Sequence, residues 1–278
     1  MSRFKELTYR ILNAALIKAI STLHHHFDIS TSYRLGPHGA AAMFEDCWFA
    51  YHPREFGCTG NIDYVAEAEN STRQALFERV RDGQTFYDIG AHGGVYTLTL
   101  LKRFPGLMVH SFEPQPEELL ENLALNAVSP NRVHAVALGD QAGTVKMTSK
   151  ERSSNHISDR GERAVPIVRL DDYIAEKELP LPDWIKIDIE GMELPALRGA
   201  KQLLLRSYPT IICEINHISD RYGSKVRDLV DFLGSLGYTM HALESGNLTA
   251  INSDTLPFSA DWNYWFLPGG ELRPLPQP

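Results

Sequence analysis

Apolar positions near the start of the chain follow a helical period. Over residues 1–27, apolar side chains recur three and four positions apart, which places them on one face of a helix. We expect this N-terminal helix to pack on the rest of the chain or on a second copy, so it is a candidate surface for homo-oligomer formation. Residues 31–60 are punctuated by glycine and proline and predict an irregular cap segment, with one strand at 47–51.

From residue 85 onward, short apolar runs typical of strands alternate with helical runs. The expected strands cover residues 85–89, 107–112, 133–138, 184–188 and 210–214, and the expected helices cover 94–103, 116–127, 195–206 and 224–236. Such alternation is typical of βαβ units, and it predicts an α/β fold with a parallel sheet between helices. Three further strands without intervening helices, at 238–243, 248–251 and 264–267, predict an antiparallel ending.

Composition and charge narrow the class of protein. Of the 278 residues, 43% are hydrophobic and 22% charged, as in an ordinary globular protein. The net charge of −8 does not indicate the basic surface that is typical of nucleic-acid-binding proteins, so we expect no nucleic acid among the partners. No apolar run is long enough for a transmembrane segment, and the three cysteines lack paired spacing. We therefore expect a cytoplasmic protein.

A glycine turn follows the first strand of the regular region. Asp88 lies within this strand, and Gly90 and Gly93 come directly after it, where glycine lets the backbone bend and approach a ligand. A second acid, Glu113, ends the next strand and is placed to accept hydrogen bonds from a ribose diol. The spacing differs from the G-x-G-x-x-G fingerprint of dinucleotide-binding proteins, which argues against a nicotinamide oxidoreductase.

The ordered set of motifs resembles the FkbM family of S-adenosylmethionine-dependent methyltransferases. The matching stretches are residues 88–97, 112–114, 137–140, 170–173, 185–193, 197–200 and 209–214. Together they cover roughly residues 80–267 and leave residues 1–60 outside the resemblance. The chain is therefore divided into an N-terminal helix and cap segment, 1–60, and a methyltransferase domain, 61–278.

The resemblance implies a Rossmann-like methyltransferase fold, a seven-stranded mostly parallel sheet whose last strand is antiparallel. It also implies S-adenosylmethionine as the methyl donor and a hydroxyl of a sugar, glycan or natural product as the acceptor. By position, the loop from Gly90 to Gly93 would hold the methionine end of the donor and Glu113 its ribose. Asp88 would orient the loop or the amino group, and Ala137 with Leu138 would border the adenine.

Polar side chains also gather after the fourth and fifth expected strands, namely Lys186, Asp188, Glu190, Glu193, Glu214, Asn216 and His217. Strand alternation places Lys186 and Asp188 on one face, where they can form an ion pair. Because an acceptor hydroxyl must lose a proton as it attacks, His217 is our first candidate for a general base, with Asp188 or Glu214 orienting it. Asp188, Glu214 and Asn216 are weak candidates for a divalent metal site, which the resemblance does not require.

Two alternative functions therefore stay open, a divalent-metal-dependent O-methyltransferase and a non-catalytic nucleotide-binding module. The acceptor pocket is expected to be lined by residues 28–60 and 150–164, among them Trp48 and His156. The first segment combines aromatic side chains with glycine hinges, and the second is a polar loop between strands. Aromatic faces with a few polar groups are typical of small-molecule sites.

Overall fold

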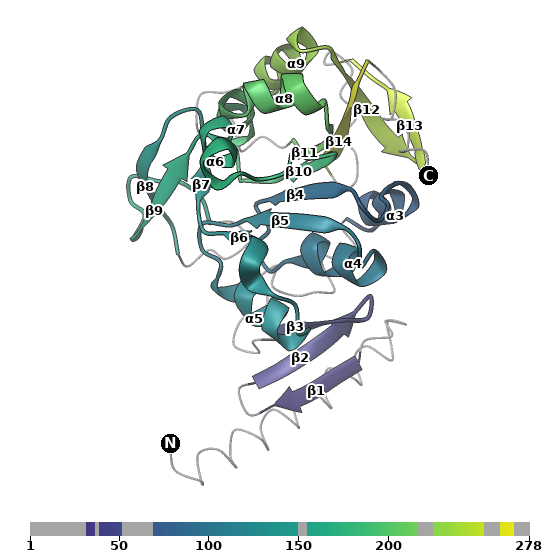
Figure 1. Cartoon of the computed structure of the whole chain (residues 1–278), viewed down its shortest axis with the longest axis vertical. Coiled ribbons are helices and arrows are strands. Elements are labelled where there is room, and N and C mark those ends of the chain that lie inside the picture. Colours follow the sequence, from purple (N-terminus) through teal and green to yellow (C-terminus); the bar gives the residue numbers. More distant parts are fainter. Residues whose placement is uncertain are drawn as a thin grey trace.

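The computed structural model describes residues 32–36, 39–51, 69–149, 155–215, 225–252 and 262–269 (Figure 1). The helix expected at 1–27 and the domain boundary expected at residue 60 both lie outside the described residues. Within the described ranges, every helix falls short of the length and apolar character that crossing a bilayer requires.

A mixed sheet forms the centre of the molecule, in the order β13-β12-β14-β11-β10-β4-β5-β6. Its strands are β4 (Thr85–Ile89), β5 (Met108–Phe112), β6 (Val133–His134), β10 (Trp184–Ile187), β11 (Thr210–Glu214), β12 (Tyr238–Glu244), β13 (Asn247–Ala250) and β14 (Asn263–Pro268). The run from β11 to β6 is parallel, and β14 pairs antiparallel with β11. This confirms the predicted Rossmann-like arrangement, and β13, which was expected at 248–251, adds an edge strand to the seven that the family resemblance implies.

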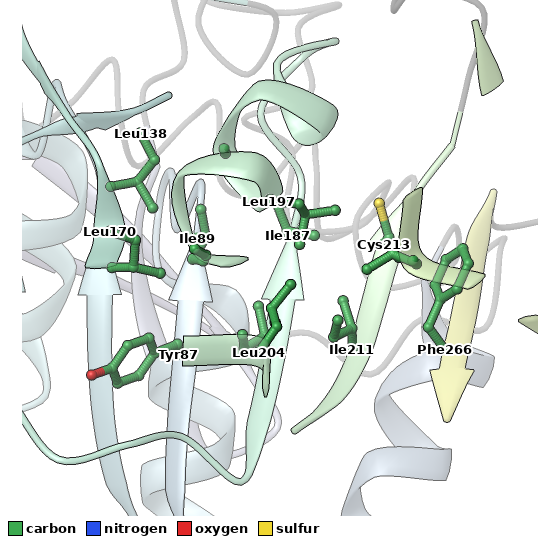
Figure 2. Close-up of a cluster of buried hydrophobic side chains, with 14 of the residues drawn as sticks. Tyr87, Ile89, Leu138, Leu170, Ile187, Leu197, Leu204, Ile211, Cys213 and Phe266 are labelled. Atoms are coloured by element: carbon green, nitrogen blue, oxygen red, sulfur yellow. The ribbon is translucent and has the colours of Figure 1, made fainter. Parts of the chain in front are cut away.

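Helices cover both faces of this sheet because its strands alternate apolar side chains between the two faces. The described helices are α3 (Asn70–Arg79), α4 (Val95–Arg103), α5 (Glu117–Leu125), α6 (Leu170–Lys177), α7 (Glu193–Gly199), α8 (Lys201–Ser207), α9 (Val226–Ser235) and the 3-10 helix η2 (Pro130–Arg132). Figure 2 shows the larger core, in which Tyr87 and Ile211 of the sheet pack with Leu197 and Leu204. On the opposite face, Phe86 and its neighbours pack against α3 and α4.

The third strand expected from the sequence is split in two. Only β6 belongs to the central sheet, because the Val136 N–H donates to the His134 carbonyl over 2.9 Å and turns the chain away. The remainder forms β7 (Ala137–Leu138), which pairs with β9 (Arg163–Val168), itself paired with β8 (Gly143–Met147). This small sheet, β7-β9-β8, stands beside the carboxyl ends of the central strands (Figure 1).

The segment expected to be irregular contains a second small sheet. Its strands β1 (Ser32–Gly36), β2 (Gly39–Phe44) and β3 (Cys47–Tyr51) pair antiparallel, and only β3 was predicted. Glu45 and Asp46 have φ angles of 46° and 61° and form the two-residue turn between β2 and β3. Alanine-rich β2 lacks the apolar and polar alternation by which a strand is recognised, which explains why the sequence did not reveal it. The β1-β2-β3 sheet lies beside α5 (Figure 1).

Candidate functional site

A cavity of about 430 Å³ opens at the carboxyl ends of β4, β5 and β10. The strand order reverses on the two sides of β4, and open α/β sheets bind ligands at such a point. Five residues expected to form the site line the cavity, namely Gly90, Glu113, Ala137, Leu138 and Asp188. The other lining residues include Ile89, His92, Phe112, Gln115, Met147, Ser149, Asn155, Ile157, Glu190 and Met192.

The glycine loop after β4 runs tightly against the end of β10. Gly90 has a φ of +84°, and a Cβ placed on it would lie 1.8 Å from the Asp188 carbonyl oxygen. Only glycine fits this position. The N–H groups of Gly90 and Ala91 both donate to the Phe112 carbonyl, at 2.9 and 3.3 Å, which holds the loop to β5 as well.

Gly93 does not line the cavity but packs against α5. A Cβ on Gly93 would lie 2.9 Å from Glu118 Oε1, so a larger residue would displace the helix side chains beneath the loop. The left-handed conformation that opens α4 belongs to the next residue, Gly94, with a φ of +80°. Gly93 therefore supports the loop through its packing against α5.

Asp88 is buried beneath the loop and does not line the cavity. Its Oδ2 accepts hydrogen bonds from the Thr97 backbone N–H at 3.1 Å and from the Thr97 hydroxyl at 2.6 Å. Burial raises the pKa of Asp88 to about 6, although both bonds from Thr97 and the nearby Lys186 ammonium oppose this shift. The carboxyl group thus fixes the first turn of α4 and, through it, the loop.

Glu113 lies at the end of β5 with its carboxylate facing the loop. One oxygen accepts the His92 N–H at 3.0 Å, and the other accepts the Gln115 N–H at 2.9 Å. Burial raises the pKa of Glu113, and these two backbone bonds oppose the shift. Because a carboxylate oxygen has two lone pairs, both oxygens keep the capacity to accept a further hydrogen bond.

The buried Lys186 and the partly exposed Asp188 and Glu214 form a group at the ends of β10 and β11. The Lys186 ammonium lies 3.3 Å from Asp188 Oδ2, as strand alternation predicted. Burial alone would raise the pKa of Asp188, but Lys186 and a hydrogen bond from Glu214 lower it. Burial and the neighbouring Asp188 charge raise the pKa of Glu214. Of the two carboxyl groups, Glu214 is therefore the one that binds a proton more readily.

The turn after β10 is held by the next acid in the sequence. Glu193 Oε1 accepts the N–H groups of Ile189 at 3.0 Å and of Gly191 at 3.1 Å. Glu190 has a φ of 57° and lines the cavity from this turn. Glu193 thus shapes the wall of the cavity, while Glu190 presents a carboxyl group to it.

Not every predicted residue is found at the cavity among the residues that the structure describes. His217 and Asn216 are outside the described residues, and Glu214 is not among the described residues that line the cavity. Trp48, on β3, and His156 are not among the residues that line the cavity, whereas Asn155 and Ile157 of the expected segment 150–164 and the adjoining Ser149 do line it. No cluster of His, Cys, Asp and Glu suited to a metal ion occurs in the described ranges.

His92 and Gln115 were not singled out from the sequence, and Asn155 was expected only as part of the segment 150–164. His92 stands inside the glycine motif, which was a signal for it. Gln115 joins the end of β5 to the β7-β9-β8 sheet, since its Nε2 donates to the Thr148 carbonyl at 2.8 Å and its Oε1 accepts from Asn155 Nδ2 at 3.3 Å. Such contacts between distant segments leave no local pattern in the sequence.

Comparison with known proteins finds methyltransferases of similar sequence. The chain is 26% identical over 201 residues to the 31-O-demethyl-FK506 methyltransferase FkbM of Streptomyces tacrolimicus, which covers 59% of this chain and 75% of that protein. It is 26% identical over 156 residues to the hexuronic acid methyltransferase AglP of Haloferax volcanii, covering 53% of this chain and 62% of AglP. The matched part thus spans less than two thirds of AglP.

A similar solved structure is methyltransferase FkbM from Methylobacillus flagellatus KT. The sequence identity is 20% and the TM-score 0.46, over 74% of this chain and 52% of that one. A family model described as the methyltransferase FkbM domain matches residues 88–240, which is more than half of the chain. The resemblance inferred from the sequence is confirmed, and with it the class of enzyme: the chain belongs to the FkbM family of methyltransferases.

Proposed function

We propose that the chain is an S-adenosylmethionine-dependent O-methyltransferase acting on a hydroxyl of a sugar, glycan or natural product. The observation that carries this proposal is the cavity at the carboxyl ends of β4, β5 and β10, which Gly90, Glu113, Ala137, Leu138 and Asp188 all line. These residues come from four separate stretches of the chain, each of which carries one of the family motifs.

The residues of the cavity fit the donor. Glu113 would accept from the ribose, the Gly90 turn would hold the methionine end, and Ala137 with Leu138 would border the adenine. The volume of about 430 Å³ lies in the range of small-molecule sites. When bound, S-adenosylmethionine supplies a methyl group on a sulfonium cation, and the nearby carboxylates suit that positive charge.

Asp188 and Glu214 differ in their roles. The neighbouring Lys186 ammonium lowers the pKa of Asp188 and favours its ionised form, and Asp188 lines the cavity. Asp188 is thus suited to orient a base or to stabilise positive charge as the acceptor hydroxyl loses its proton. His217 follows β11 directly in the chain and remains our candidate for the base itself.

Two relatives support the acceptor class. Their names describe a methyltransferase of 31-O-demethyl-FK506 and one of a hexuronic acid, a natural product and a sugar. In this chain, Met147 and Ile157 give the cavity an apolar wall beside the polar Ser149 and Asn155. A wall of this mixed character suits an acceptor with a carbon skeleton and a few hydroxyls.

The metal-dependent alternative has less support from the donor set. Asp188 and Glu214 lie together, but the buried Lys186 ammonium already provides the positive charge beside them. A divalent cation at the same place would be repelled by that ammonium. We therefore propose methyl transfer in which the chain's own acids and imidazole handle the proton.

Cys47 and Cys213 are free thiols, which supports a reducing, cytoplasmic location.

Calorimetric titration of the protein with S-adenosylmethionine and, separately, with NAD tests donor binding. We expect saturable binding of the first and none of the second; the reverse result would refute the proposal. A screen of glycan and polyketide acceptors with methyl-labelled donor, read by mass spectrometry, then tests transfer. Donor binding with no labelled product across that screen would favour the non-catalytic module.

A further inference from the structure

Asn122 of α5 and Asn126, the residue that caps the C-terminal end of α5, hold strand β3 through their side-chain amides. Asn126 Oδ1 accepts the Trp48 N–H at 2.7 Å, and Asn126 Nδ2 donates to the Trp48 carbonyl at 2.6 Å. One helical turn earlier, Asn122 Oδ1 accepts the Ala50 N–H at 2.7 Å. The two side chains together attach the β1-β2-β3 sheet to the helix.

Asn122 makes a second contact that Asn126 does not. Its Nδ2 donates to the Gly93 carbonyl at 2.8 Å, so one amide joins β3 to the glycine loop. The side chain is 1% exposed, and its orientation is fixed because the Ala50 N–H requires an acceptor and the Gly93 carbonyl requires a donor. Reversing the amide would break both bonds.

Apolar packing joins the same two regions independently of the amides. Phe49 of β3 and Ala91 of the glycine loop belong to one buried cluster, together with Leu119 and Leu123 of α5. The loop is therefore sandwiched between β5, to which Gly90 and Ala91 donate, and the face of α5 that also carries the small sheet.

From these contacts we infer that Asn122 is a positioning residue for the methyl donor, and that the β1-β2-β3 sheet acts through it as part of the donor-binding site. Asn122 holds the Gly93 carbonyl of the loop, and Gly90 and His92 of the same loop line the cavity. This inference rests on the proposed use of S-adenosylmethionine. It also gives the N-terminal sheet a function different from that of the acceptor-pocket lining expected from the sequence.

The two asparagines provide a matched pair for the experiment. Asn122→Ala removes the bonds to Ala50 and Gly93, whereas Asn126→Ala removes bonds to β3 and to the Asn122 carbonyl but none to the loop. We expect both variants to lower Tm. Only Asn122→Ala should raise the Kd for S-adenosylmethionine, by about three- to tenfold, as the loss of one buried hydrogen bond implies.

Asn122→Asp separates the two bonds of Asn122 further. The aspartate keeps an acceptor for the Ala50 N–H but loses the donor to Gly93, so the inference requires it to raise the donor Kd as well. Equal Kd values for the Asn122→Ala and Asn126→Ala variants would overturn the inference. Should Asn122→Ala fail to fold, a wild-type Kd in Asn122→Asp would overturn it instead. Absence of donor binding by the wild-type protein would refute the proposed function itself, so the two failures can be told apart.

Discussion

At the scale of single residues, Glu113 is the side chain on which donor recognition depends most directly. We predict that Glu113→Ala weakens the binding of S-adenosylmethionine by about 1–3 kcal/mol, the range for a hydrogen bond to a charged group. Calorimetry measures this. Glu117→Ala is a suitable control, because Glu117 lies at the exposed edge of the same cavity and pairs with Arg163. Unchanged affinity in Glu113→Ala would contradict the ribose assignment.

His217 carries the prediction about proton transfer. If its imidazole accepts the hydroxyl proton, His217→Ala should lower kcat by roughly 10²–10⁴-fold while the donor Kd stays near that of the wild type. Turnover with labelled donor and calorimetry measure the two quantities. A loss well below tenfold would instead favour catalysis by positioning, which can supply roughly 7–11 kcal/mol of the barrier.

Substitution of Gly90 tests the steric fit of the loop, and substitution of Gly83 is the control for backbone strain alone. Gly90 and Gly83 have nearly the same φ, +84° and +83°, but a Cβ on Gly83 would meet nothing within 4 Å. Gly83→Ala should therefore cost only the strain of a left-handed residue, about 1–2 kcal/mol of unfolding free energy. Gly90→Ala should cost clearly more and should abolish donor binding. Denaturant unfolding of the two variants compares them, and equal losses would show that the Asp188 carbonyl is not the obstacle.

At the scale of elements, the edge of the sheet formed by β5 and β6 contains a buried pair of imidazoles. His110 Nδ1 lies 3.0 Å from His134 Nε2, and His134 Nδ1 lies 3.2 Å from the Tyr173 hydroxyl on α6. Burial lowers the pKa of each histidine to about 4. Between about pH 6.5 and 4, these groups bind protons in the unfolded chain but not in the folded protein, so the unfolding free energy falls as the pH falls.

We predict that Tm decreases on acidification from about pH 7 to about pH 5, and that the variant carrying both His110→Gln and His134→Gln shows a smaller decrease. Thermal unfolding at several pH values measures this. His156→Gln, in the loop before β9, serves as the control for the loss of a histidine outside this pair. An unchanged slope in the double variant would mean that other groups account for the acid sensitivity.

The elements also show how far the sequence predicts this structure. The parallel strands were predictable because each is buried on both faces and therefore reads as an apolar run, as in β4 and β11. Strand β2 was not predictable, because its run of alanines shows no alternation of apolar and polar residues. Gly90 and Glu113 were predictable because the backbone demands of the turn and the strand end are local. The contacts of Gln115 and Asn122 were not, since they join segments far apart in the chain.

At the scale of the whole molecule, the buried positive charge of Lys186 bears on metal dependence. Its ammonium lies 3.3 Å from Asp188 Oδ2, on strand β10, which pairs with β4 on one side and with β11 on the other. We predict that treatment with a chelator leaves methyl transfer undiminished, as measured by turnover of labelled donor before and after removal of divalent ions. Loss of turnover that is restored by adding magnesium would show that the metal-dependent alternative is correct.

The amide pair on α5 also has a consequence for how molecules of this protein meet each other. A helix advances about 6 Å over four residues, and a strand advances about 6.6–6.8 Å over two. Asn122 and Asn126 are therefore spaced to reach Trp48 and Ala50 as a neighbouring strand would. Strands with unpaired backbone edges recruit strands from other molecules and seed aggregation. On this side of β3, the two asparagines occupy the groups that such a strand would need.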